Sequence, residues 1–255
     1  MTQPDARLAL ACLDLTSLNV ADTEADIAAL CGRAQSPFGP VAAVCVWPRL
    51  AAFARAQLPA SIAVAAVANF PHGHADVEAA IQDTLQIVAA GAQEVDVVLP
   101  YRSLMAGDEQ AVSALLTVVR RACPGMVLKV ILETGELKTP ALTERACQLS
   151  LDAGADFLKT STGKTPVSAT LAAARVMLGA IAANPAARHR VGFKAAGGIR
   201  TVAEATAYLA LAQELLGAHA LTPQRFRIGA SSLLDDIEAV LSGRLAVTAT
   251  KSGTY

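Results

Sequence analysis

The chain has 255 residues, of which 53% are hydrophobic, so it is long enough to bury a substantial core. Its formal net charge of −1 and pI near 6.4, with no basic run, argue against nucleic acid or an anionic membrane as a partner. The five cysteines lack CxxC spacing, which favours reduced thiols over disulfides or a zinc site. Because the sequence has neither a signal-peptide pattern nor an apolar run of the about 18 residues needed to span a bilayer, a soluble cytoplasmic protein is expected.

Short apolar runs recur along the chain and alternate with alanine-rich segments of helical length. The runs are near-continuously apolar, as expected for parallel strands that are covered on both faces. We predict strands at residues 8–13, 41–46, 61–67, 94–99, 127–132, 156–158, 191–193 and 226–228. Helices are predicted at 23–33, 75–90, 109–122, 141–153, 168–183 and 202–216, and several of them stop at a glycine.

Strict alternation of strands and helices implies a parallel sheet, and eight such units imply closure into a (β/α)8 TIM barrel. An open doubly wound sheet is the alternative, but it would need a glycine-rich dinucleotide loop after an early strand, and the sequence has none. Since no linker divides the chain, we expect a single catalytic domain over residues 1–242. The polar residues 243–255 are expected to form a mobile tail that ends in Tyr255.

Polar residues follow the predicted strands at the end where a barrel carries its catalytic groups. They are Asp14 with Thr16 and Asn19, Cys45, Asn69, Asp96, Lys129 with Glu133, Lys159, Lys194, and Gly229 with Ser231 and Ser232. Charged groups at so many strand ends should converge at one pocket mouth, where mutual pairing offsets the cost of burial. The alternative is a purely structural layer of salt bridges inside the barrel.

Two of these lysines, Lys159 and Lys194, follow the sixth and seventh strands and should lie side by side in a closed barrel. Burial and a neighbouring ammonium both disfavour the charged form, which is how a lysine becomes an amine nucleophile near neutral pH. One lysine would be the nucleophile and the other its charged neighbour, and the residues alone do not say which. Asp96 could transfer protons or serve as a counter-ion.

Glycine-bearing loops after the last strands predict a phosphate site. Glycine lets backbone N–H groups approach an anion, and helix N-termini favour negative charge. The predicted phosphate-binding residues are Gly163, Lys164, Gly197, Gly198, Gly229, Ser231 and Ser232. Ordinary helix capping by the two serines is the alternative. His72 and His74 lack an obvious third ligand, so no metal site is predicted.

The motifs together resemble the deoxyribose-phosphate aldolases, which are class I, Schiff-base-forming aldolases on a (β/α)8 barrel. The resemblance runs over nearly the whole chain and includes residues 13–19 (LDLTSLN), 69–73 (NFPHG), 94–98 (EVDVV), 129–135 (KVILETG), 157–164 (FLKTSTGK), 192–200 (GFKAAGGIR) and 227–232 (RIGASS). Two positions depart from the family pattern. Ala195 replaces a frequent proline, and Trp47 replaces a smaller aromatic residue.

The resemblance implies that Lys159 forms the Schiff base, that Lys194 lowers its pKa and that Asp96 takes part in proton transfer. It also suggests proton exchange by Tyr255. We further expect Asp14, Thr16, Cys45, Lys129 and Thr162 to bind substrate. The implied reaction is reversible cleavage of 2-deoxy-D-ribose 5-phosphate to D-glyceraldehyde 3-phosphate and acetaldehyde, in deoxyribose phosphate catabolism, with no metal or organic cofactor.

The alternatives are another Schiff-base phosphosugar aldolase or transaldolase, and a non-catalytic phosphosugar-binding barrel. They differ from the favoured interpretation in the donor aldehyde that they accept and in whether a covalent adduct forms on Lys159. Barrels of this kind often pair, so a homodimer is one expected assembly.

Overall fold

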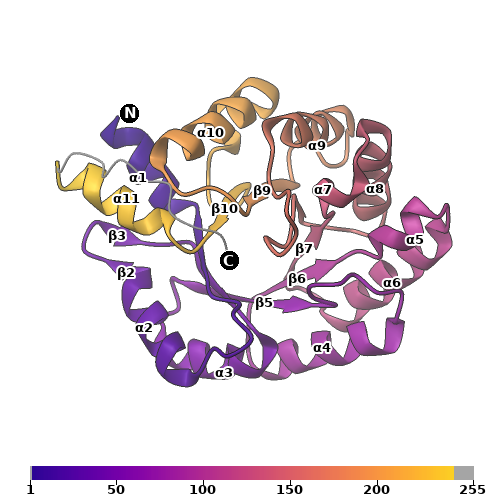
Figure 1. Ribbon diagram of the computed structural model, residues 1–255, viewed down its shortest axis with the longest axis horizontal. Helices are drawn as coiled ribbons and strands as arrows, with labels where there is room; N and C mark the ends of the chain where they lie inside the picture. Colours follow the sequence, from indigo (N-terminus) through magenta and orange to yellow (C-terminus); the bar gives the residue numbers. More distant parts are fainter. Residues whose placement is uncertain (1, 244–255) are drawn as a thin grey trace.

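The computed structural model describes residues 2–243 and confirms the predicted (β/α)8 barrel. Eight parallel strands close on one another in the order β1-β10-β9-β8-β7-β6-β5-β4, and helices surround them (Figure 1). The barrel strands are β1 (Leu13–Thr16), β4 (Ala43–Val46), β5 (Ala63–Ala68), β6 (Glu94–Val98), β7 (Val127–Ile131), β8 (Phe157–Lys159), β9 (Gly192–Ala196) and β10 (Phe226–Ala230). The division predicted between residues 242 and 243 stays a prediction, since 244–255 lie outside the described residues.

The helices alternate with the strands along the chain, and most of them cover the outer face of the barrel. They are α1 (Gln3–Ala11), α2 (Glu24–Ala34), α3 (Pro48–Gln57), α4 (Val77–Ala89), α5 (Tyr101–Met105), α6 (Glu109–Ala122), α7 (Thr134–Leu137), α8 (Pro140–Asp152), α9 (Leu171–Ala183), α10 (Val202–Leu216) and α11 (Leu233–Leu241), with the 3-10 turn η1 (Ala218–Ala220). Capping residues fix several starts. Thr23 and Thr201 each form a reciprocal capping box, with Asp26 and Glu204 respectively. Among the described residues, no helix is both long and apolar enough to cross a membrane.

The strand predicted at residues 8–13 is wrong. Residues 3–11 form α1, and the first strand begins only at Leu13. Thr2 caps the helix and a proline occupies its first turn, both of which favour a helix start. Leu10 is buried on the inner face of α1, which packs against α11 and α10 across the outer layer. An apolar run of this length fits a strand or a helix equally well, so the pattern did not distinguish them.

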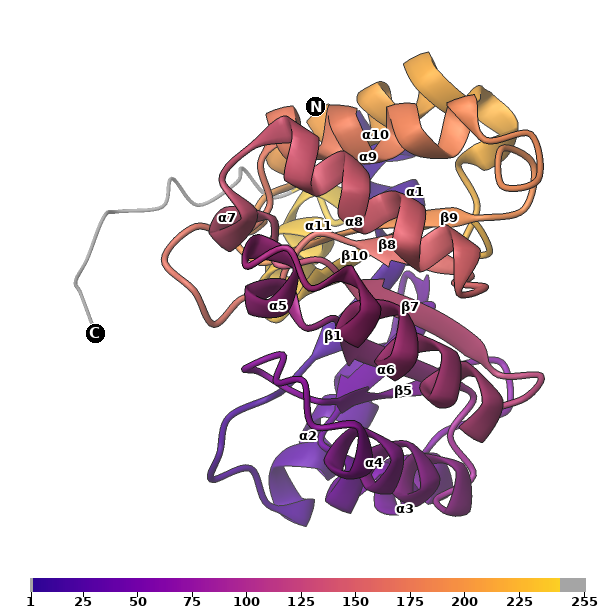
Figure 2. The ribbon, with the colours of Figure 1, turned by 90° about the vertical axis from the view of Figure 1, so that its right-hand side faces the viewer.

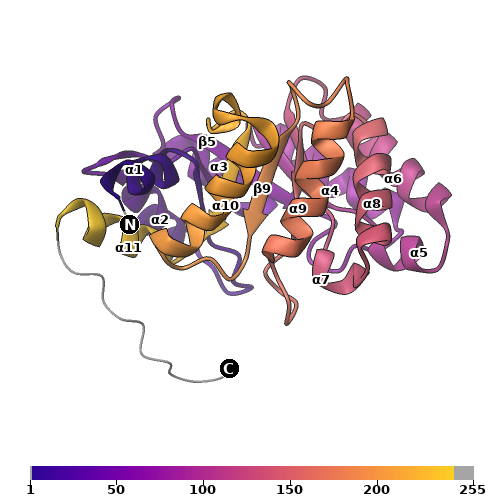
Figure 3. The ribbon, with the colours of Figure 1, turned by 90° about the horizontal axis from the view of Figure 1, so that it is seen from above.

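The other seven strands fall within a few residues of their predicted ranges. The structure also contains elements that were not predicted individually. They include α3, the short helices α5 and α7, and a hairpin of β2 (Gln35–Ser36) and β3 (Gly39–Pro40) outside the barrel. Figures 2 and 3 show α5 and α7 at one end of the barrel, the end where the strands finish.

Apolar side chains fill the layer between strands and helices, whereas charged side chains occupy the inside of the barrel. Alternate residues of a strand face opposite ways, so Val95 and Val97 pack outward while Asp96 faces inward. On the β4 and β5 side, Cys45 and Ala65 join a small apolar cluster separate from the main core. Small residues there leave room for the long side chains that reach in from β7, β8 and β9.

Candidate active site

Six of the predicted site residues come from six different strands and meet inside the barrel. They are Asp14 on β1, Cys45 on β4, Asp96 on β6, Lys129 on β7, Lys159 on β8 and Lys194 on β9. Lys159 is 3% exposed and the other five are fully buried. Ionised groups at this depth are stable only when paired, so the contacts among them decide which charges persist.

Asp96 connects the three lysines. Its Oδ2 accepts hydrogen bonds from Nζ of Lys159 and Nζ of Lys194, each at 2.8 Å, and its Oδ1 accepts one from Lys129 Nζ at 2.8 Å. Strand register produces this geometry, because Asp96 lies beside Lys129 and Lys159 lies beside Lys194. The expectation that Lys159 and Lys194 are neighbours is therefore confirmed.

Two further charged residues, Glu94 and Arg227, complete the group, and the sequence had suggested no role for either. Arg227 donates to Asp14 Oδ1 at 2.6 Å and to Glu94 Oε1 at 2.8 Å. Lys129 Nζ donates to the other oxygen of Glu94. The available signal was spacing, since Glu94 and Asp96 are two residues apart on one strand and so face the same side. We call these seven residues, Asp14, Glu94, Asp96, Lys129, Lys159, Lys194 and Arg227, the buried charge cluster.

The contacts distinguish Lys159 from Lys194. Burial opposes a charge on Lys194, but the carboxylates of Asp14 and Asp96 outweigh it and raise the pKa of Lys194. Burial also opposes a charge on Lys159, and within the described residues Asp96 is the one carboxylate in contact with its amine. That contact is shared with Lys194, so the pKa of Lys159 falls below its ordinary value, chiefly through desolvation.

Asp96 and Lys129 are held in their charged forms. Burial alone would raise the pKa of Asp96, but the neighbouring lysines, above all Lys129, hold it well below its usual value. The pKa of Lys129 is raised by Asp96 and Glu94 against the opposing effect of burial. Cys45 lies 3.9 Å from Asp96 Oδ2, and burial raises the pKa of its thiol, which therefore stays protonated.

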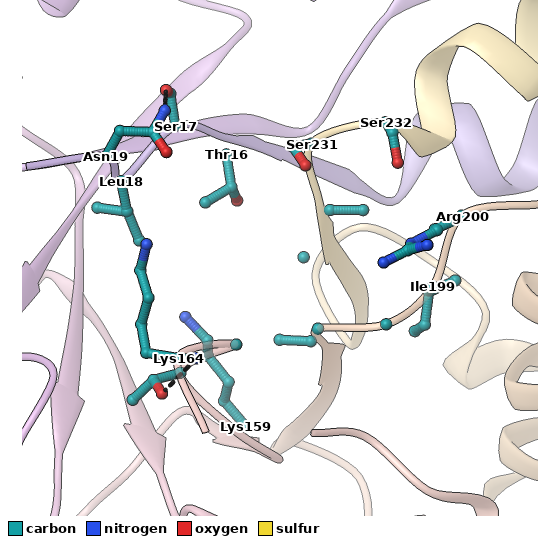
Figure 4. Close-up of a pocket in the computed structure, with 17 residues that line it drawn as sticks. Thr16, Ser17, Leu18, Asn19, Lys159, Lys164, Ile199, Arg200, Ser231 and Ser232 are labelled. Atoms are coloured by element: carbon teal, nitrogen blue, oxygen red, sulfur yellow. Dashed lines mark hydrogen bonds between the residues drawn. The ribbon is translucent and has the colours of Figure 1, made fainter. Parts of the chain in front are cut away.

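A pocket of about 290 Å³ opens above the cluster at the carboxyl end of the barrel (Figure 4). Lys159 is the one cluster residue among its lining residues, and its amino group points toward the open centre. Thr16 and Thr162 also line it. Asp14, Cys45 and Lys129, which were expected to bind substrate, lie beneath the pocket and not in its wall.

All seven predicted phosphate-binding residues line this pocket. We call them the pocket rim: Gly163, Lys164, Gly197, Gly198, Gly229, Ser231 and Ser232. Gly197 has φ 84°, and a Cβ there would lie 2.7 Å from Ser168 Cβ, so only glycine fits. A Cβ on Gly229 would lie 3.0 Å from Cε of Lys194, so this glycine also makes room for the buried lysine.

Helix capping, the alternative role for the two rim serines, is not seen at α11. Ser232 occupies the N-cap position of α11, yet its side chain makes no capping hydrogen bond. Both serines are exposed and lie across the pocket from Lys164 in Figure 4. Arg200, which the sequence had not singled out, also lines this side of the pocket. A phosphate group accepts hydrogen bonds from donors of these kinds, namely hydroxyl groups, backbone N–H groups of glycine loops and cationic side chains.

Glu133, at the end of β7, ties the loop that carries Gly163 and Lys164 to the barrel. Its carboxylate is buried and accepts hydrogen bonds from Thr162 Oγ1 at 2.5 Å and Thr165 Oγ1 at 3.3 Å. Thr162 thus lines the pocket with its hydroxyl already engaged. After Lys159, Ser161 Oγ donates to the carbonyl of Ala196 on the neighbouring strand at 2.5 Å.

Other polar residues named from the sequence serve the loops around the site. Asn69 donates to the carbonyls of His74 and Val98, and Asn19 Nδ2 donates to Asp22 Oδ1 at 3.0 Å. Trp47 packs edge to face on Phe70 and donates to the carbonyl of Asn19. Tyr255 lies outside the described residues, so its suggested proton exchange stays a prediction.

Comparisons with known proteins agree with one another. The sequence pattern described as "DeoC/LacD family aldolase" matches residues 8–239. A deoxyribose-phosphate aldolase from Agrobacterium fabrum is 50% identical over 241 residues, which cover 93% of this chain and 92% of that protein. A Toxoplasma gondii structure assigned to the same enzyme has a TM-score of 0.86 and 26% identity, covering 94% and 95% of the two chains. A deoxyribose phosphate aldolase from Aeropyrum pernix, described as tetrameric, has a TM-score of 0.72 and 26% identity, covering 93% and 92%.

Proposed function

The chain belongs to the DeoC/LacD family of aldolases, and from this premise we propose that it reversibly cleaves 2-deoxy-D-ribose 5-phosphate to D-glyceraldehyde 3-phosphate and acetaldehyde. The relative from Agrobacterium fabrum supports this substrate, because the identity of 50% extends over 93% of the chain. One observation carries the proposal. Lys159 is the one lysine of the buried charge cluster that both has a lowered pKa, through desolvation, and lines the pocket.

In the proposed reaction, the neutral amine of Lys159 attacks the C1 carbonyl carbon of the open-chain sugar. The carbinolamine loses water and leaves a protonated imine, which draws electrons from the adjacent carbon. A base removes the proton of the C3 hydroxyl, and the C2–C3 bond breaks to release D-glyceraldehyde 3-phosphate. The electron pair of that bond forms an enamine on Lys159. Protonation at C2 and hydrolysis of the imine then release acetaldehyde.

Proton transfers are assigned to Asp96 and Lys194. Asp96 Oδ2 lies 2.8 Å from both Lys159 and Lys194, so a proton leaving the nucleophile has a partner within hydrogen-bond distance. Burial and the ammonium of Lys194 lower the pKa of Lys159, and Lys194 is itself a proton donor. Asp14 holds Lys194 in place from below. Thr16 and Thr162 are proposed to contact the sugar, with Cys45 and Lys129 completing the base of the site.

The pocket rim is proposed to bind the 5-phosphate. Glycine-loop N–H groups and the serine hydroxyls supply fixed donors, and Lys164 supplies a charge. No metal or organic cofactor is required, because the protonated imine is itself the electron sink. All five cysteines are free and buried, which supports the proposed cytoplasmic location. A homodimer is proposed as the assembly, and sedimentation velocity would test it.

The test is to incubate the protein with deoxyribose phosphate and borohydride and to identify the modified peptide by mass spectrometry. We expect reduced adduct on Lys159, and none after Lys159→Met. Efficient addition of acetaldehyde to glyceraldehyde 3-phosphate separates this function from that of another Schiff-base aldolase or a transaldolase. Absence of an adduct together with absence of turnover would leave only the phosphosugar-binding alternative.

A further inference from the structure

Arg227 and Glu94 form an ion pair deeper in the barrel than Lys159. The Arg227 side chain is 8% exposed and that of Glu94 is 3% exposed, and neither residue lines the substrate pocket. The cost of burying these charges is offset by charge-assisted hydrogen bonds, since Arg227 donates to Glu94 Oε1 at 2.8 Å and to Asp14 Oδ1 at 2.6 Å. Groups that cannot touch substrate can affect the reaction only through their neighbours.

Two short chains of contacts lead from this pair to the nucleophile. Glu94 accepts from Lys129, which donates to Asp96 Oδ1 at 2.8 Å. On the other side, Asp14 accepts from Lys194, which donates to Asp96 Oδ2 at 2.8 Å. Both chains end on Asp96, the carboxylate that contacts Lys159. The pair is therefore connected through hydrogen bonds to the carboxylate that the three lysines share.

The charges in the cluster balance only when one cation is neutral. Asp14, Glu94 and Asp96 supply three negative charges, whereas Lys129, Lys159, Lys194 and Arg227 could supply four positive ones. Arg227 is charged at any ordinary pH, and the carboxylates hold Lys129 and Lys194 charged. The uncharged member is then Lys159, which makes one carboxylate contact where Lys194 makes two.

We propose that Arg227 and Glu94 are positioning residues that set, by charge balance, whether Lys159 carries a proton. This inference rests on the proposed role of Lys159 as the nucleophile. Removing Arg227 leaves three acids against two other cations, so a proton on Lys159 restores balance. Removing the charge of Glu94 leaves two acids against three cations, so a proton on Lys159 adds to an existing excess. The two changes therefore act in opposite directions.

The ionisable groups that surround Lys159 inside the barrel come from six other strands. They are Asp14 on β1, Cys45 on β4, Asp96 and Glu94 on β6, Lys129 on β7, Lys194 on β9 and Arg227 on β10. The β5 strand contributes only alanine and valine. Cys45 stays protonated and adds no charge. The carboxylate of Glu133 is engaged with the loop at Thr162 and Thr165 and lies outside these contacts.

The experiment measures the rate at which acetaldehyde and cyanoborohydride modify Lys159 over a series of pH values. The rate rises with pH as the amine loses its proton, so the midpoint reports the pKa of Lys159 in the free protein. We expect Arg227→Met to move this midpoint up by about one pH unit and Glu94→Gln to move it down by a similar amount. That shift is the size expected from one charge within about 10 Å at an effective dielectric constant of about 20.

The double variant Arg227→Met/Glu94→Gln separates charge balance from packing. It removes one charge of each sign, so we expect its midpoint to return close to that of the unmodified protein. If the Arg227 variant does not fold, the downward shift of Glu94→Gln decides the question. Shifts in the same direction, no shift in Glu94→Gln, or a double variant displaced further than either single one would overturn the inference.

The same data distinguish failure of the inference from failure of the proposed function. If Lys159 is not the nucleophile, the unmodified protein acquires no adduct there at any pH. If Lys159 is the nucleophile but the deeper pair plays a structural part only, all variants that fold form the adduct with an unshifted midpoint. Circular dichroism and thermal melting of each variant identify which of them fold.

Discussion

Below the pocket, seven ionisable side chains lie almost fully buried and paired with one another, whereas around its mouth glycines, serines and Lys164 meet solvent. The buried charge cluster is built from long side chains whose positions depend on each other. The pocket rim is built from backbone whose conformation depends on having no side chain, as at Gly197. The difference indicates a division of labour, with reactivity set below and phosphate binding set above.

Lys159→Met is the most severe test of this division, because it removes the proposed nucleophile while leaving the rim intact. We expect kcat to fall on the order of a thousandfold or more, since no other lysine of the cluster lines the pocket within the described residues. Binding of deoxyribose phosphate, measured by calorimetry, should persist. Lys138→Met, at an exposed lysine, is the control and should retain full activity. Substantial turnover by the Lys159 variant would contradict the assignment.

Asp96→Asn tests the cluster at its centre. The substitution leaves three lysines around a neutral amide, so we expect a loss of about 3 to 5 kcal/mol in the free energy of unfolding, together with most of the activity. Urea denaturation measures the first and a coupled cleavage assay the second. Ser232→Ala on the rim should leave the unfolding free energy within about 0.5 kcal/mol of the original. Equal stability of the two variants would remove the contrast between the regions.

Lys194→Leu addresses the pH dependence. Without the neighbouring ammonium, Lys159 has sole use of Asp96 Oδ2, so the pKa of Lys159 should rise toward its ordinary value. The nucleophile must be neutral to attack, and kcat/KM therefore increases as pH rises through this pKa. We expect the acidic limb of the profile to move up by about one pH unit or more. An unchanged limb would show that Lys194 does not perturb its neighbour.

Lys164→Ala probes the rim and should give the smallest effect. One charge-assisted contact to phosphate is lost, so we expect KM for deoxyribose phosphate to rise about tenfold with little change in kcat. Unphosphorylated deoxyribose should show no such change, which makes it the internal control. If kcat fell as much as KM rose for both sugars, the rim would belong to the reactive part of the site.

The sequence alone was sufficient to predict the barrel and most of the residues that line the pocket. Repeated strand–helix units imply closure, and polar residues at strand ends must meet once the strands are parallel. The glycine loops were predictable because few other residues adopt the backbone of Gly197. The run at residues 8–13 failed because an apolar segment of that length satisfies two periodicities, and its helical form depends on packing against α10 and α11.

The choice between Lys159 and Lys194 could not be made from residue types, since both are strand lysines with apolar neighbours in sequence. It depends on how many carboxylate oxygens reach each amine, and that follows from strand register and side-chain direction. Arg227 and Glu94 were missed for the same reason. Arg227 and Glu94 lie 133 residues apart in the chain, and only the closed barrel brings them together.

The central claim is that Lys159 loses its proton more readily than Lys129 and Lys194, which the carboxylates keep charged. Nuclear magnetic resonance of the protein labelled with 15N-lysine tests it directly, because the Nζ resonance differs between an amine and an ammonium. The chain has six lysines, so single substitutions assign the signals. We predict that, as the pH rises, the Lys159 resonance changes from ammonium to amine first, while Lys129 and Lys194 remain as ammonium. A Lys159 signal that stays charged until Lys129 and Lys194 have lost their protons, or a Lys194 signal that titrates first, would contradict this prediction.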